Sequence, residues 1–65
     1  MKLKSEHKEL FVLLIKAGVD KKTAMGIIIE ILETNKPFQQ FFDWIQSVNK
    51  TTSETALNKF DELYY

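Results

Sequence analysis

The residues of this chain that could do acid–base or metal chemistry are few, and their spacing does not gather them. His7 is the single histidine, with Glu6 and Glu9 as its acidic neighbours in sequence. These residues fall in the first turn of a predicted helix, so we expect His7 to be solvated. A carboxylate needs burial or a close like charge before its pKa rises toward neutrality. We therefore predict no catalytic dyad at this end of the chain.

Two further glutamates, Glu30 and Glu33, lie three residues apart on one face of a predicted helix. That face is the narrow polar stripe of a mostly apolar helix, so we expect a solvated pair. The chain has no cysteine and only two glycines, which excludes a disulfide, a thiolate metal site and a glycine-rich phosphate loop. No ladder of Asp and Asn residues resembles a calcium loop. The sequence predicts a protein that is not an enzyme and holds no cofactor or metal.

A chain of 65 residues makes one small domain, which buries only about 60% of its unfolded surface. Because no disulfide is available, regular helix packing or oligomerisation must supply the stability. The longest apolar run, residues 10–15, is far shorter than the roughly 20 residues of a membrane span. Charged residues continue to Glu9 and no small-residue cleavage site follows, so we expect neither membrane insertion nor secretion. The expected location is cytoplasmic.

The charges balance overall but are unevenly distributed. Nine basic and nine acidic residues give a formal net charge of zero. Residues 1–22 carry a net +3 and residues 23–65 a net −3. The chain has no arginine, the side chain that best reads guanine and phosphate through paired hydrogen bonds. The composition therefore speaks against nucleic-acid recognition.

Helix stop and start signals divide the chain into four predicted helices, which cover residues 5–17, 20–34, 37–49 and 52–64. Gly18 ends the first helix and Asp20 caps the second. Pro37 falls in the first turn of the third helix, and Thr51 with Glu54 forms a capping box for the fourth. Strand signals are missing. The predicted fold is all-α, a compact bundle of four short helices in which the first or the second helix is central.

The first two predicted helices carry more apolar surface than a monomer of this size needs. Residues 10–15 are all apolar, and at about 100° per residue they point in nearly every direction around the helix axis. The second helix is apolar around most of its circumference. A helix that is apolar all round is normally buried on all sides. Either the first helix is a hub that the other three surround, or this surface meets another chain.

Residues 17–29 resemble the turn of the lac-repressor-type helix-turn-helix family. The match consists of small, turn-forming and apolar residues in a fixed order, here Ala17-Gly18-Val19-Asp20, Thr23-Ala24 and Ile27-Ile28. The resemblance implies that the second helix enters the DNA major groove, with contacts from Lys21, Lys22 and Thr23. The chain departs from the family at Leu14, where a small residue is expected, and its zero net charge leaves few phosphate contacts. Helix capping alone also explains the same turn.

Two further resemblances concern longer parts of the chain. From Leu13 to Ile45 the chain resembles ubiquitin-associated domains, with matching places at Gly18-Val19, Ala24 and Trp44-Ile45. This implies a compact helical core and ubiquitin binding, although the second helix is too long and the fourth is extra. From Leu10 to Leu63 the chain is similar to short uncharacterised proteins of Gram-positive bacteria and their prophages. That similarity implies a small bacterial or phage helical protein and assigns no activity.

Gly26 and Trp44 are the residues that packing within one chain explains least. Glycine inside a helix costs about 1 kcal/mol relative to alanine, so Gly26 is either a drifted surface position or a place where another chain crosses closely. Trp44 lies at the edge of an apolar face, as a core-edge residue or as an interface anchor.

The predicted function is non-enzymatic protein–protein interaction, as a regulator, adaptor or inhibitor, with a phage origin and a homodimer among the forms we consider. A lysine-rich N-terminal segment would steer the chain toward acidic surfaces. A helix-turn-helix DNA-binding regulator is the alternative, and a ubiquitin-associated-like domain the lesser one. The predicted contact surface comprises Val12, Met25, Gly26, Ile29 and Trp44.

Overall fold

In the computed structural model of the chain, residues 5–65 are described, and they form four helices and no strand. The helices are α1 (Ser5–Ala17), α2 (Lys21–Thr34), α3 (Gln39–Val48) and α4 (Ser53–Tyr64). The predicted all-α bundle of four short helices is confirmed. None of the helices in residues 5–65 is both long enough and apolar enough to cross a bilayer. Lys2 and Lys4, part of the predicted basic segment, lie outside the described residues.

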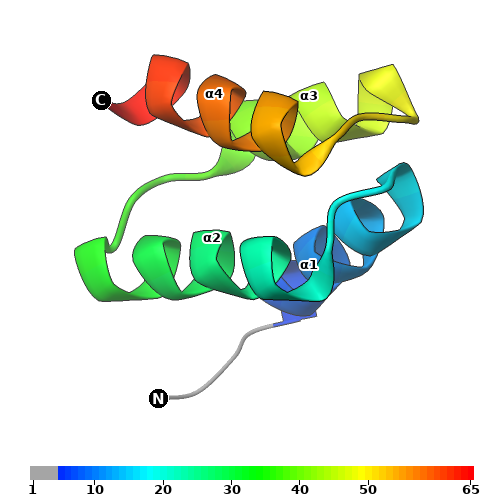
Figure 1. The fold of residues 1–65 in the computed structure, drawn as a ribbon. Coiled ribbons are helices and arrows are strands. Elements are labelled where there is room, and N and C mark those ends of the chain that lie inside the picture. The colour runs from blue at the N-terminus through cyan, green and yellow to red at the C-terminus, as the bar shows by residue number, and fades with distance from the viewer. Residues whose placement is uncertain (1–4) are drawn as a thin grey trace.

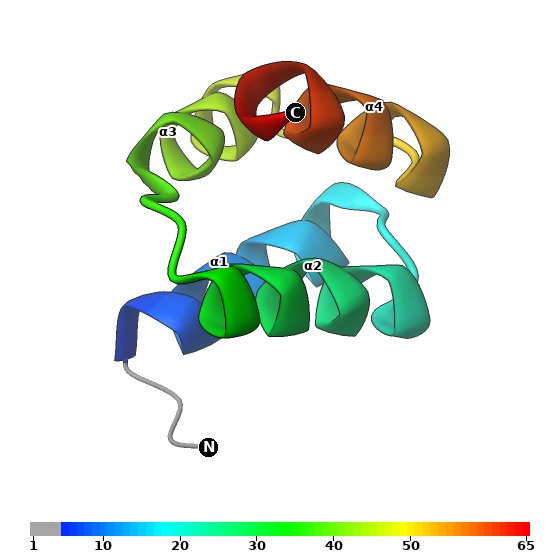
Figure 2. The ribbon, with the colours of Figure 1, turned by 90° about the vertical axis from the view of Figure 1, so that its left-hand side faces the viewer.

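The four helices lie in two layers, with α1 and α2 in one and α3 and α4 in the other (Figure 1, Figure 2). α1 packs against α2 and α3, and α4 also packs against α2 and α3. Between α1 and α4, and between α2 and α3, no Cα atoms of the described helices come within 8 Å. The prediction that the first or the second helix lies at the centre of the bundle is therefore wrong. The linker over residues 35–38 carries the chain from one layer to the other, so every helix has two neighbours and an outward side.

The core fills the space where the two layers meet. Each helix contributes side chains at spacings of three and four residues, as the apolar periodicity predicts. Phe41 is fully buried, with the centroid of the Phe60 ring 5.4 Å from its own in an edge-on pair and that of the Trp44 ring 5.6 Å away in a stacked pair. Such aromatic pairs add to the hydrophobic stabilisation of the core. The buried apolar residues are Leu10, Leu14, Ala17, Val19, Ala24, Ile27, Ile28, Ile31, Phe41, Ile45, Ala56 and Phe60.

The joint between α1 and α2 has the caps that the sequence predicts. Gly18 adopts a φ of 118°, a region that L side chains rarely enter. Its N–H donates to the Ile15 carbonyl at 3.2 Å, and the Val19 N–H donates to the Leu14 carbonyl at 3.0 Å. These two bonds satisfy carbonyls at the end of α1 in the manner of a Schellman motif.

The predicted start of α3 is wrong by two residues. α3 begins at Gln39, and its N-cap, Phe38, makes no side-chain capping hydrogen bond. Asn35 ends α2 in the left-handed conformation, with φ 54° and ψ 38°, so Pro37 belongs to the crossing between layers. The Phe38 ring packs against the His7 ring at 4.8 Å. The crossing is thus packed onto α1, and Pro37 lies before the helix instead of in its first turn, where proline is common.

The predicted cap of α4 is wrong by one residue. Thr52, not Thr51, is the N-cap, because its hydroxyl oxygen accepts from the Thr55 N–H at 3.1 Å. The Thr51 N–H instead donates to the Ala17 carbonyl at 2.9 Å. This bond to the end of α1 holds Thr51 outside the helix, and Glu54 therefore does not complete a capping box.

Candidate functional site

Six large apolar side chains of the described chain are exposed: Val12, Ile15, Met25, Ile29, Leu57 and Tyr65. Four of them belong to α1 and α2, the two helices that carry more apolar surface than a monomer of this size needs. Single exposed apolar residues are ordinary on a protein surface. Exposed apolar residues mark an interaction site when several of them lie together.

One group lies on α2 alone. Met25 and Ile29 are 37% and 39% exposed, and with Gly26, Lys21 and Lys22 they line a shallow hollow of about 530 Å³. These five residues are called the α2 surface below. α1 and α4 pack against α2, and the buried residues of α2 lie on its other side, so this part of the helix is directed outward. The apolar side chains are accessible to a partner, and the two lysines border them at one end.

Gly26 is central to this surface, and nothing in the described chain requires a glycine there. A Cβ atom added to Gly26 would meet no atom within 4 Å. Gly26 also borders a second hollow, of about 430 Å³, which lies between α2 and α4 and includes Leu57 and Tyr65. The predicted contact surface does not include Leu57 or Tyr65, because the spacing within one helix does not show which helix lies beside it.

Two residues of the predicted contact surface are separated from the α2 surface. Val12 is 47% exposed but lines a different hollow, of about 340 Å³, with residues of α1 and α3 such as Phe42. Trp44 is half-buried in the other layer, where its ring stacks on Phe41. The structure therefore brings together three of the five predicted residues, those that one helix carries, and places the other two elsewhere.

The residues of the DNA-binding alternative are also on α2. Lys21 and Lys22 are exposed in its first turn. Thr23 is half-buried and engaged in the helix cap, since its N–H donates to an Asp20 carboxylate oxygen at 3.1 Å and its hydroxyl to the other at 2.6 Å. Of the three residues, the two lysines present charge to solvent.

A negative charge stands at the same end of α2. The hydroxyls of Ser53 and then Thr23 are the main cause that lowers the pKa of Asp20 from 3.8 to about 2, and the Thr23 N–H adds to it. Hydrogen bonds that favour the charged form have this effect. Asp20 is therefore ionised at neutral pH, and its charge lies next to the helix end where a phosphate group would have to approach.

His7 is buried, and the prediction of a solvated histidine is wrong. Only 7% of its surface is exposed, and its Nδ1 has no hydrogen-bond partner among residues 5–65. His7 precedes Leu10 by three residues and Leu14 by seven, which places it on the buried side of α1. That spacing was visible in the sequence. The missing information was that the crossing at Phe38 covers the first turn of α1.

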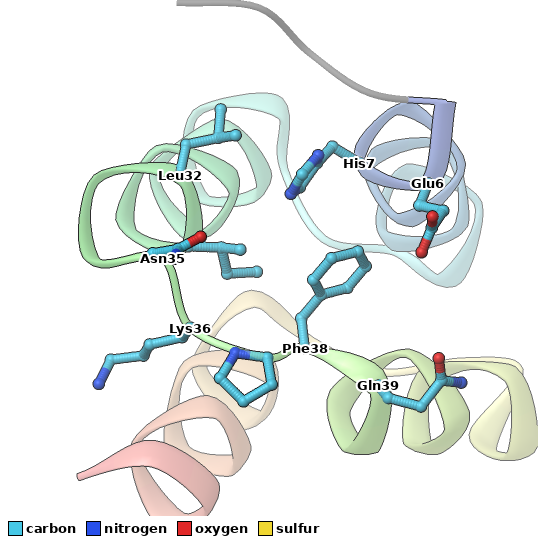
Figure 3. Close-up of a pocket in the computed structure, with 9 residues that line it drawn as sticks. Glu6, His7, Leu32, Asn35, Lys36, Phe38 and Gln39 are labelled. Atoms are coloured by element: carbon cyan, nitrogen blue, oxygen red, sulfur yellow. The ribbon is translucent and has the colours of Figure 1, made fainter.

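The His7 imidazole borders a hollow of about 400 Å³ at the crossing between the layers. Figure 3 shows the ring turned toward the end of α2, near Leu32 and Asn35, and the Glu6 carboxylate turned away from it. No hydrogen bond joins Glu6 to His7 in the described chain. Residues 5–65 also contain no group of three or more His, Asp or Glu side chains placed to hold a metal ion. The hollow thus offers a lone imidazole and no paired acid.

Comparisons with known proteins do not assign the chain to a family. A comparison of the chain with family models, with curated proteins and with solved structures gave no match. The α2 surface is therefore characterised by its own residues, which are two exposed apolar side chains around a glycine, bordered by two lysines.

Proposed function

We propose that this chain is a non-enzymatic protein–protein interaction module of the cytoplasm, a regulator, adaptor or inhibitor that binds its partner through the α2 surface. The exposure of Met25 and Ile29 around Gly26 is the observation that carries the proposal. Burying this surface against a partner contributes about 25 cal/mol for each Å² of apolar area removed from water. An apolar group with a charged border is typical of interaction sites.

The residue types on the α2 surface suit a partner helix. Gly26 carries no side chain, so the backbone of a partner can approach α2 closely. Met25 has a flexible side chain that adapts to different partner shapes. Lys21 and Lys22 would attract acidic side chains and raise the rate of encounter. Together these features support the docking of an apolar helix face, one of the recurring modes of recognition.

The test is affinity capture from the cells that express the chain, with wild type and two matched variants. Ile29→Glu should lose the captured partner and keep its helical circular dichroism, because Ile29 is partly exposed. Ile15→Glu makes the same change at an equally exposed isoleucine of α1 and should keep the partner. Met25→Glu serves as a second variant of the surface. A partner that survives both α2 substitutions would show that the proposal is wrong.

A duplex-DNA-binding regulator is the second candidate, favoured by the exposure of Lys21 and Lys22 in the first turn of α2. The ionised Asp20 beside them opposes it. Fluorescence anisotropy of a labelled duplex at low and moderate salt separates the two functions. Binding that weakens steeply with salt, and that Lys21→Gln with Lys22→Gln removes, would support the DNA function. No binding at either salt removes this candidate.

A further inference from the structure

We propose that the partner of the α2 surface is a second copy of this chain, docked antiparallel along α2 about a two-fold axis. The inference rests on the proposed function, because it names the occupant of the same surface. It is carried by the order of four residues along one stripe of α2 and by the direction of the charges on that helix.

The four residues are Lys22, Gly26, Ile29 and Glu33. They follow one another at intervals of four, three and four residues, so they lie in one stripe along α2. All four are exposed. At 1.5 Å per residue the stripe is about 16 Å long. In that order the stripe presents a positive charge, a position without a side chain, an apolar side chain and a negative charge.

A stripe with this order is complementary to its own reversed copy. The midpoint between Lys22 and Glu33 along α2 is also the midpoint between Gly26 and Ile29. A two-fold axis through that midpoint places Ile29 of each copy opposite Gly26 of the other. The same axis places Lys22 of each copy opposite Glu33 of the other. A two-fold interface requires this self-complementarity, in which every contact occurs twice.

Between Lys21 and Thr34 the charges of α2 run against its own helix dipole, and only the ionised N-cap Asp20, just outside the helix, favours it. The first turn carries Lys21 and Lys22 and no acidic residue, and the last turn carries Glu33 and no basic residue. Within a single helix, positive charge near the N-terminus and negative charge near the C-terminus are unfavourable. In the antiparallel pair each Lys22 lies beside the C-terminal end of the other α2, and each Glu33 beside the N-terminal end. The second copy thus turns an unfavourable arrangement into a favourable one.

Gly26 has a role in this pair that it lacks in the single chain. The space around a Cβ atom at Gly26 is open within the described chain, so the fold alone would accept alanine, the better helix former. In the antiparallel pair the missing side chain makes room for Ile29 of the other copy. Met25 lies beside this contact in the same hollow and would cover its edge.

The interface is small, so the dimer should be weak and depend on concentration. One helix face per copy buries less than the roughly 1,600 Å² of a standard interface. The formal net charge of zero leaves no long-range repulsion between copies to oppose association. Because the charge pairs lie at the solvent-exposed ends of the stripe, salt should weaken the dimer.

The experiment is analytical ultracentrifugation of the full chain over a range of concentrations, with charge-reversal variants. The wild-type mass should rise from 7.6 kDa toward twice that value. Lys22→Glu and Glu33→Lys each bring like charges together at two symmetric places and should weaken association by roughly tenfold. The double variant restores opposite charges in every pair and should regain most of the wild-type association.

Two controls separate the interface from the fold. Lys22→Glu and Glu33→Lys both favour the helix dipole of the single chain, so loss of dimer cannot reflect an unstable helix. Lys50→Glu makes the same charge change at an exposed residue outside α2 and should leave association unchanged. Gly26→Gln should remove the dimer by filling the gap, while the monomer keeps its helical circular dichroism.

Two outcomes would overturn the second copy as partner. A chain that stays monomeric up to about 1 mM does not recognise itself at any relevant affinity. A dimer whose association is unchanged by Lys22→Glu and by Glu33→Lys forms through another surface. If the chain is monomeric and the captured partner is still lost in Ile29→Glu, this inference fails and the proposed function stands. If neither dimer nor Ile29-dependent capture is found, both fail.

Discussion

Ser53, the first residue of α4, is hydrogen-bonded in two directions to Asp20, the N-cap of α2. The Asp20 N–H donates to the Ser53 Oγ at 3.0 Å, and the Ser53 hydroxyl donates to the Asp20 carboxylate. A few residues away the Thr51 N–H donates to the Ala17 carbonyl at 2.9 Å. The turn between α1 and α2 is thereby bonded to the turn between α3 and α4, at the end of the molecule opposite the crossing between layers (Figure 1).

The bond between Asp20 and Ser53 predicts a loss of stability in acid. The Ser53 hydroxyl, followed by the Thr23 hydroxyl, lowers the folded-state pKa of Asp20 from 3.8 to about 2. Because the folded pKa is the lower one, the ionised group stabilises the fold above about pH 4 and loses this effect as the pH falls toward 2. Asp20→Asn keeps a capping side chain and should flatten the pH dependence in this window. Thermal unfolding at several pH values measures it, and equal slopes for the two proteins would contradict the prediction.

The two glycines should respond to alanine in opposite directions. Gly18 has a φ of 118°, and a Cβ atom there would lie 2.7 Å from the Thr51 carbonyl oxygen. Gly18→Ala should therefore cost about 1–3 kcal/mol of unfolding free energy. Gly26→Ala meets no atom within 4 Å and should raise the stability of the monomer by about 1 kcal/mol. Urea unfolding of both variants, at a concentration where the chain is monomeric, gives the comparison. Equal signs would refute it.

Replacing the buried histidine by an apolar residue should stabilise the protein. The His7 Nδ1 has no hydrogen-bond partner among residues 5–65, and a buried polar atom without a partner costs about 1–3 kcal/mol. His7→Leu should therefore raise the unfolding free energy by about 1 kcal/mol. His7→Ala is the control and should lower it, because it leaves a cavity beside Phe38. If His7→Leu destabilises the chain, the imidazole makes a hydrogen bond that leucine cannot replace.

Alanine substitutions at two adjacent threonines test where α4 begins. Thr52 caps the helix through the Thr55 N–H at 3.1 Å, so Thr52→Ala should cost about 1 kcal/mol. The Thr51 hydroxyl makes only a long contact, at 3.4 Å to the Thr52 carbonyl, and the structural role of Thr51 lies in its backbone. Thr51→Ala should therefore cost less. A larger loss at Thr51 in denaturant unfolding would place the cap one residue earlier.

Contacts between residues close in the chain are enough to specify the four helices and the helix ends that such residues cap. Apolar spacing predicts each helix. Gly18 and Asp20 mark the α1–α2 joint because the bonds that end α1 and cap α2 join residues no more than five apart. The candidate site was predictable to the same extent. Met25, Gly26 and Ile29 are on one helix, so their common face follows from helix geometry alone.

Features that depend on residues far apart in the chain follow only from the packing of the helices. The layer crossing buries His7, and the bond of Thr51 to Ala17 moves the cap of α4 to Thr52. Val12 and Trp44 belong to other helices, and only the two-layer packing shows that they lie outside the α2 surface. Asp20 and Ser53 are separated by 33 residues. Local periodicity carries no information about such a pair, because the contact forms only when the packed core brings two helix ends together.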